Sequence, residues 1–221
     1  MEILTFATTI IFSVAVVALI ISVHEAAHAY AAHLLGDDTA RDFGRLTLNP
    51  RAHIDPFGTI ILPLILVLFG LPVFGWAKPT PFSPLNLQNP RRDSALIAIA
   101  GPVSNLLVAF LVAVLSRLVF GNNVATMFGS GIFTTFVFPI VLFNVTLAVF
   151  NLLPVEPLDG FKVVGGLLPE ALSATWYSLA HLGPIILFIL LFTPGTDIIG
   201  RIISPLTSTI LSLLLGLPSS L

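Results

Sequence analysis

The sequence has no cysteine and few charged side chains. Its 221 residues include 9 Lys and Arg and 11 Asp and Glu, so that only 9% are charged while 56% are hydrophobic. The absence of cysteine excludes disulfide bonds, thiolate metal ligands and a cysteine nucleophile. Because soluble domains carry about 25% charged residues, this scarcity excludes a soluble globular fold. A net charge of −2 provides no basic surface for nucleic acid.

Long apolar runs are what the sequence has instead. They predict helices at about 3–35, 94–119, 131–153, 174–193 and 198–217. Since a helix needs roughly 20 apolar residues to cross a bilayer, we predict an all-α polytopic membrane protein with five to six transmembrane helices, surrounded by lipid. The first run lacks a preceding basic segment, so we interpret it as a retained helix and not a signal peptide.

The most polar stretch of the chain is 37–56. Within it, residues 41–48 alternate loosely between polar and apolar side chains and end at Asn49–Pro50. Such a pattern favours a short strand or hairpin. We therefore predict a short membrane-associated β-hairpin at 41–48.

Residues 57–75 are apolar but contain prolines and glycines, and non-helical backbone is tolerated at membrane depth where protein or water covers it. If this segment enters the membrane and returns, one face holds most of the basic residues: Arg41, Arg45, Arg51, Lys78, Arg91, Arg92 and Lys162. Only Arg117 and Arg201 then lie opposite, as the positive-inside rule requires. If the segment crosses, this asymmetry is lost. We therefore predict a re-entrant segment at 57–75 with the basic loops in the cytoplasm.

His24-Glu25-Ala26-Ala27-His28 lies inside the first predicted helix. At 100° per residue the two histidines are about 40° apart, and Glu25 lies about 60° beyond His28. This spacing lets two imidazoles bind one zinc ion while the carboxylate accepts a proton from water that the zinc activates. An ionisable group inside a span costs about 2.5–3.5 kcal/mol, so a chance pattern on a polar helix face is the weaker interpretation.

A catalytic zinc site needs a third protein ligand. We expect a capping or interfacial role for His33, which lies on another face of the helix, and local hydrogen bonds for His53 and His181. Asp159 differs from these, because it lies in Asn151-Leu-Leu-Pro-Val-Glu-Pro-Leu-Asp-Gly160. This proline-rich break ends an apolar helix and leaves side chains and carbonyls free at one depth.

Three further segments accompany the HEAAH motif and the segment that ends in Leu158-Asp159-Gly160: Gly101-Pro102-Val103-Ser104-Asn105, Asn49–Gly58 and Gly75–Pro79. In this combination the chain resembles the site-2 protease family of intramembrane zinc metalloproteases. It is most similar to the compact bacterial branch without PDZ or CBS domain. The resemblance covers about 20–165. We predict a single membrane domain over 1–221, with a catalytic core at about 3–165 and C-terminal helices at about 174–217.

The resemblance implies one zinc ion per chain, held by His24, His28 and Asp159, with Glu25 as the general base. It implies cleavage of a transmembrane segment of a membrane-protein substrate. The location it implies is a bacterial or archaeal cell membrane, with the active site towards the cytoplasm. If 57–75 is re-entrant, the HEAAH motif and Asp159 emerge on the same side and can share the metal.

Three asparagines are predicted to contact substrate. The resemblance assigns Asn151 to holding an unwound substrate segment, and Asn144, which shares its helix face, and Asn105 are expected to assist. For Asn144 an interhelical hydrogen bond is an equal alternative. Because the peptide carbonyls of a transmembrane helix are shielded, substrate must unwind, and we expect it to pair with the edge of the 41–48 hairpin.

Other interpretations stay open. Glu156 departs from the family pattern, which has a hydrophobic residue or proline there, and we consider that it pairs with Lys162 or alters substrate preference.

A catalytically silent relative would bind zinc and act as a binding or scaffold protein. A transporter would be expected to show inverted repeats, and none is visible. An unrelated HExxH protease would use Glu156 or Glu170 as its third ligand.

Overall fold

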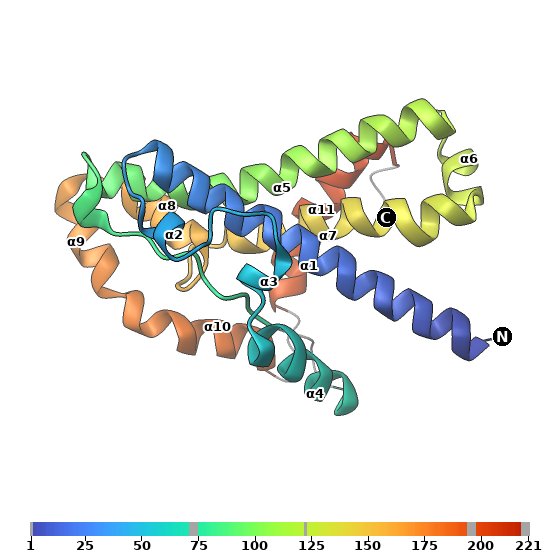
Figure 1. Cartoon of the computed structure of the whole chain (residues 1–221), viewed down its shortest axis with the longest axis horizontal. Helices are drawn as coiled ribbons and strands as arrows, with labels where there is room; N and C mark the ends of the chain where they lie inside the picture. Colours follow the sequence, from blue (N-terminus) through green and yellow to red (C-terminus); the bar gives the residue numbers. More distant parts are fainter. Residues whose placement is uncertain (1, 71–74, 122, 194–197, 218–221) are drawn as a thin grey trace.

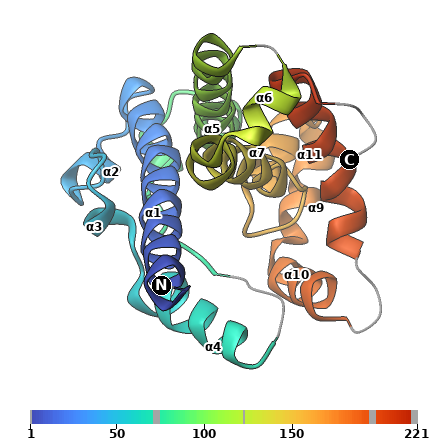
Figure 2. The same cartoon turned by 90° about the vertical axis from the view of Figure 1, so that its right-hand side faces the viewer.

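Helices make up all the regular structure in the part of the chain that the computed structural model describes, residues 2–70, 75–121, 123–193 and 198–217. The longest are α1 (Glu2–Leu34) and α5 (Pro90–Phe120), which pack against each other (Figure 1). Viewed roughly along these helices, α1 lies on one side of α5, and α7 (Phe138–Asn151) and α11 (Ile198–Leu215) lie on the other (Figure 2). The helix α5 therefore connects the two halves of the bundle.

Four helical stretches are long and apolar enough to cross a membrane: Phe12–Leu34, Pro90–Phe120, Phe133–Asn151 and Glu170–Phe192. The prediction of an all-α membrane protein is thus confirmed. The predicted count of five to six spans is larger than these four, because Pro56–Leu68 and Gly200–Leu215 are shorter apolar helices. The protein is an integral membrane protein with at least four candidate spans.

The predicted helix at 174–193 is divided in the structure. It comprises α9 (Glu170–Ser178), a 3₁₀ turn, η4 (Ala180–Leu182), and α10 (Gly183–Phe192). Pro184 occupies the first turn of α10, where the missing proline N–H costs no helical hydrogen bond. The division explains why Figure 1 shows α9 and α10 as consecutive, differently directed helices.

The predicted β-hairpin at 41–48 is wrong, since the described residues of this stretch form a short helix and turns. The helix α2 (Thr39–Asp42) starts this stretch, and the backbone N–H of Arg45 bonds back to the Ala40 carbonyl at 2.8 Å. Gly44 has a φ of +67°, which reverses the chain where a strand would have to continue. These local bonds use the backbone groups that a partner strand would need, so the expected edge for substrate pairing is also absent here.

Asp37 is the reason that the chain turns at this point. Its carboxylate is fully buried and accepts hydrogen bonds from the backbone N–H and the hydroxyl of Thr39, at 3.2 and 2.5 Å. It also accepts from the Ser83 N–H at 2.8 Å and from the Asn86 amide, in η2 (Pro84–Asn86), at 2.7 Å. Asp37 therefore ties the end of α1 to the loop that precedes α5.

Replacing Asp37 with asparagine is expected to lower the free energy of unfolding by about 2 kcal/mol, because hydrogen bonds to a charged acceptor contribute about 1.5–3 kcal/mol. Burial raises the pKa of the Asp37 carboxyl, but the bonds from Thr39, Asn86 and Ser83 outweigh burial and hold the pKa below its ordinary range. The stabilisation is therefore complete above the unfolded pKa of about 3.9 and is lost as pH falls through the lower native pKa.

Thermal unfolding in detergent micelles measures this difference. The unfolding temperatures of wild type and Asp37→Asn should differ at pH 7, and the difference should shrink as pH falls from about 4 through the lowered native pKa of Asp37. Asp42→Asn, the same change at an exposed carboxylate, is the matched control and should have no effect. Equal unfolding temperatures for Asp37→Asn and Asp42→Asn at pH 7 would contradict the role given to Asp37.

The apolar segment after the polar stretch is too short to span a bilayer. It follows α3 (Pro50–His53) and consists of a π-helical turn, η1 (Pro56–Ile61), and α4 (Leu62–Leu68), together about 20 Å long at 1.5 Å per residue. The hydrocarbon core is about 30 Å thick. The backbone N–H of Trp76 bonds to the Gly58 carbonyl at 3.1 Å, so the chain returns to the beginning of this segment. In both views α4 projects away from α5 and α7 (Figures 1 and 2).

The main apolar core lies where α5, α7 and α11 meet. Its fully buried members include Ala109 and Ala113 on α5 and Val141 and Val145 on α7. Small side chains on α5 let the neighbouring backbones approach closely, as membrane helices require. Phe133, in the π-helical turn η3 (Phe133–Val137), closes this core towards α6 (Val124–Gly129).

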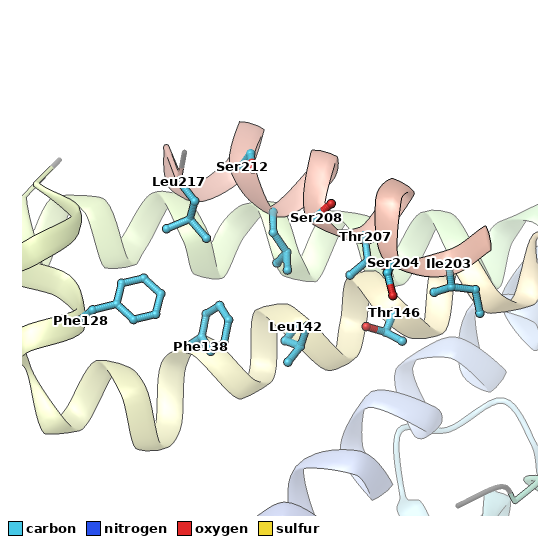
Figure 3. A pocket seen from close by; sticks show the side chains of 11 residues that line it. Phe128, Phe138, Leu142, Thr146, Ile203, Ser204, Thr207, Ser208, Ser212 and Leu217 are labelled. Carbon is cyan, nitrogen blue, oxygen red and sulfur yellow. The ribbon is translucent and has the colours of Figure 1, made fainter. Parts of the chain in front are cut away.

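A groove of about 420 Å³ runs between α7 and α11 (Figure 3). Apolar side chains and hydroxyl groups share its lining, and Thr146 on α7 and Ser204 on α11 both point into it. Within the described part of the chain, the Thr207 hydroxyl is buried there without a hydrogen-bond partner. The residues predicted for the metal site are not among those that line the groove.

Candidate metal centre

The two histidines of the HEAAH motif project from the C-terminal half of α1 into the bundle. His24 and His28 are 5% and 7% exposed, and their Nε2 atoms are 3.0 Å apart. Glu25 belongs to the same group, because one possible ligand atom of each of these three residues lies within 4.8 Å of the others. The helical spacing thus places two imidazoles and a carboxylate together, as the sequence predicts.

Asp159 reaches the histidines from α8 (Asp159–Leu167), a helix that packs against α5. Its Oδ2 lies 3.1 Å from Nε2 of His24 and 3.3 Å from Nε2 of His28. This position depends on Gly160, since a Cβ there would be 2.2 Å from the Leu152 carbonyl oxygen at the end of α7. The Asp-Gly pair therefore combines a carboxylate with the close helix approach that brings it to the histidines.

A chain of hydrogen bonds fixes the His24 ring. The Asn144 amide donates to the Ile140 carbonyl at 2.9 Å, so its oxygen is free to accept from the Asn105 amide at 3.0 Å. This orientation turns the Asn105 oxygen towards Nδ1 of His24, at 2.6 Å. Asn105 and Asn144 are both 0% exposed, and the structure places them behind the ring of His24.

The His28 ring is held from α5 in the same way. Its Nδ1 lies 2.7 Å from the Ile97 carbonyl oxygen. Gly101, one turn further along α5, leaves room for the rings: a Cβ there would be 2.4 Å from Nε2 of His28 and 2.6 Å from Cε1 of His24. The lack of a side chain at Gly101 therefore allows both imidazoles to pack directly against α5.

These contacts fit a bound cation. Because each Nδ1 faces an oxygen acceptor, it carries the ring proton, and the Nε2 of a neutral imidazole presents a lone pair. Three acceptor atoms, from His24, His28 and Asp159, then converge at 3.0–3.3 Å, a repulsive arrangement that either a proton on Nε2 or a metal ion between the atoms relieves. Ligands of a tetrahedral zinc ion at about 2.0–2.1 Å lie about 3.3 Å from each other, so the donor set suits zinc.

Thr80 is a further contact of the group that the sequence analysis did not identify. Its backbone N–H and its hydroxyl both donate to Oε2 of Glu25, at 2.9 and 2.8 Å. The two residues are far apart in sequence, and Thr80 lies in a loop without periodicity, so no pattern indicated the contact. Thr80 is half-buried beside α1.

The other histidines take local roles. His33 pairs with Asp38, and His181 lies 2.7 Å from the Ser178 carbonyl oxygen through Nδ1. His53 is fully buried, and its Nε2 is 2.8 Å from the Thr47 carbonyl oxygen. The structure therefore brings none of these three rings to the pair formed by His24 and His28, as the sequence analysis expected.

Asn151 and Glu156 lie outside the hydrogen-bond chain at His24. The Asn151 amide donates to the Leu147 carbonyl of its own helix at 3.0 Å, and its contact with substrate stays a prediction. Among the described residues, Glu156 forms no ion pair with Lys162. The Lys162 ammonium lies 5.5 Å from the centre of the Phe82 ring instead.

Two histidines and a glutamate that are grouped on one helix in the HExxH spacing, and that could hold a metal ion, are typical of zinc metalloproteases. The sequence comparisons agree, because the family model described as peptidase family M50 matches residues 12–193. The chain belongs to this family, the site-2 protease family, and is a zinc metalloprotease of it.

Similar bacterial proteins are also described as zinc metalloproteases. A protein of Bacillus subtilis (strain 168), described as "Putative zinc metalloprotease YwhC", is 44% identical over 183 residues, which cover 81% of this chain and 80% of the relative. "Putative zinc metalloprotease Rip2" of Mycolicibacterium smegmatis is 33% identical over 178 residues, or 79% of this chain and 64% of that protein. No solved structure matches the chain.

Proposed function

We propose that this protein hydrolyses a peptide bond within a transmembrane segment of another membrane protein. The observation that carries the proposal is the convergence of His24, His28 and Asp159, with distances of 3.0–3.3 Å between their acceptor atoms, beside Glu25 and within a bundle of membrane helices. In this proposal the first three residues hold one zinc ion per chain and Glu25 is the general base.

The chain's own residues supply orientation and proton transfer. When bound, zinc polarises a peptide carbonyl and makes water easier to deprotonate. Glu25 accepts the proton of the attacking water on its carboxylate and delivers a proton to the leaving amine nitrogen. Asn105 and the Ile97 carbonyl hold the imidazole protons at Nδ1, so each ring keeps its Nε2 lone pair towards the metal. Asn151 stays our candidate for a substrate contact. For Asn144 and Asn105, which are fully buried and hydrogen-bonded to each other, we propose instead that they support the His24 ring.

The proposed topology places the site near the cytoplasmic side. The closeness of Trp76 to Gly58 supports a re-entrant segment at 57–75; residues 71–74 lie outside the described part of the chain. The contact of Asp159 with the histidines supports the same topology, because a crossing segment would direct the two motifs to opposite sides. We also propose that the whole of 1–221 acts as one membrane domain with its catalytic core at about 3–165.

Metal removal tests the proposed function. Protein purified in detergent should contain about one zinc ion per chain by elemental analysis, and it should cleave a synthetic transmembrane peptide. A strong zinc chelator should abolish cleavage, and added zinc should restore it. Full cleavage after complete zinc removal would contradict the mechanism, while one zinc ion per chain without cleavage of any transmembrane peptide would favour a zinc-binding scaffold protein.

A further inference from the structure

The segment that carries Thr80 is pinned to the protein on both sides of this residue. We call residues 76–83 the strap. On one side, the N–H groups of Trp76 and Lys78 donate to the carbonyls of Gly58 and His53, at 3.1 and 2.8 Å, and the Thr59 hydroxyl donates to the Trp76 carbonyl at 2.8 Å. On the other side, the Ser83 N–H donates to the buried Asp37 carboxylate. The strap is therefore anchored on both sides of Thr80.

Two prolines make the centre of the strap stiff. Thr80 lies between Pro79 and Pro81, and a residue that precedes proline is restricted to extended conformations. Proline itself has a fixed φ and no N–H. The only backbone donor of residues 79–81 is thus that of Thr80, and it is directed at Glu25.

Thr80 engages one oxygen of the Glu25 carboxylate. Its N–H and hydroxyl both donate to Oε2, and the hydroxyl is also 3.1 Å from the Glu25 backbone carbonyl oxygen. Among the described residues no hydrogen bond is donated to Oε1 of Glu25. Two donors on one oxygen fix the rotation of the carboxylate plane and leave the other oxygen to receive a proton.

We infer that Thr80 is a positioning residue, which holds Glu25 with Oε1 directed at the reacting water. The inference rests on the proposed function, because it assigns Thr80 a role only through the general base. A rigid donor suits this role, since a base held at its reactive angle avoids reorganisation when the proton moves. The strap is also anchored to residues 53–59, so the re-entrant region is linked mechanically to the base.

The variant Thr80→Val tests the inference, because it removes the hydroxyl and keeps both the side-chain shape and the backbone N–H. Cleavage of a synthetic transmembrane peptide should show kcat lowered about tenfold, from the loss of one hydrogen bond to a charged group. The KM and the zinc content should stay at wild-type values. Thr80→Ser, which restores the hydroxyl, should recover kcat to within about threefold. Thr134→Val, at an exposed hydroxyl that donates to the Ser130 carbonyl four residues earlier, is the matched control.

A second readout does not depend on cleavage. The infrared carboxylate band that disappears in Glu25→Gln identifies Glu25, and this band should shift in Thr80→Val but not in Thr80→Ser or Thr134→Val. An unshifted band in well-folded Thr80→Val, or a kcat equal to or above that of wild type, overturns the inference, and a raised kcat would mean that Thr80 obstructs the base. Failure of the proposed function looks different: cleavage then survives in Glu25→Gln itself.

Discussion

Replacing Glu25 with glutamine is expected to lower the rate of cleavage by at least about 100-fold while leaving zinc bound. Glutamine keeps the size of the side chain and can still contact Thr80, but it cannot accept a proton from water. General acid–base catalysis contributes about 10²- to 10⁴-fold to a rate, so kcat should fall by this factor. The metal should remain, because His24, His28 and Asp159 are unchanged.

The measurement combines zinc content, thermal unfolding and cleavage of a transmembrane peptide by the same preparation. Glu170→Gln is the matched control, because Glu170 is an exposed glutamate at the start of α9, and this variant should cleave as wild type does. Cleavage by zinc-loaded Glu25→Gln at the wild-type rate would show that Glu25 is not the base, and the proposed mechanism would have to be abandoned.

Replacing Asp159 with asparagine is expected to weaken zinc binding by on the order of 10²- to 10³-fold. Zinc sites with four ligands bind with roughly 10–16 kcal/mol, so one ligand accounts for about a quarter of this free energy. Asparagine has nearly the same shape as aspartate and can still fit beside Gly160, so the helix approach at α8 should persist. Competition with a metal-binding dye measures the affinity directly, and cleavage at limiting zinc should be lost in parallel.

Glu156→Gln is the matched control for this change. Glu156 lies in the same proline-rich break, and it is the alternative third ligand if the chain were an unrelated HExxH protease. We expect Glu156→Gln to bind zinc as wild type does. If Glu156→Gln loses zinc and Asp159→Asn keeps it, the assignment of the third ligand is reversed.

The histidine–glutamate cluster could be predicted from sequence because its geometry is local. His24, Glu25 and His28 lie within little more than one helical turn, so the 3.6-residue period alone places them on one face. The cost of ionisable groups in a bilayer also makes each of them conspicuous in so apolar a chain. The closeness of Asp159 to these residues could not be predicted from spacing, because no sequence pattern shows that α8 packs against α5. The resemblance to a known family was the basis for that prediction.

The failures concern side chains that act over long sequence distances. The alternation at 41–48 predicted a hairpin. The buried Asp37 carboxylate instead accepts hydrogen bonds from the N–H groups of Thr39 and Ser83, which stabilises a turn at the beginning of this stretch. The contact of Thr80 with Glu25 arises because the strap is anchored to residues 53–59 and to Asp37. The periodicity of apolar residues carries no information about such hydrogen bonds between residues far apart in the sequence. The prolines and glycines of 57–75 indicate an irregular segment. They do not predict the length of the short helix that the structure has there, Pro56–Leu68.

The contacts at Nδ1 of the two histidines have a consequence for how the cell produces the active enzyme. Asn105 and Ile97 both belong to α5, so the pairing of α1 with α5 orients the imidazoles before any ion arrives. Small zinc domains behave differently, because they are unfolded until metal binds. We therefore expect zinc loading to be the last step of biosynthesis, after membrane insertion and helix assembly. Cells starved of zinc should accumulate folded, dormant protein, which becomes active when the metal returns without new synthesis.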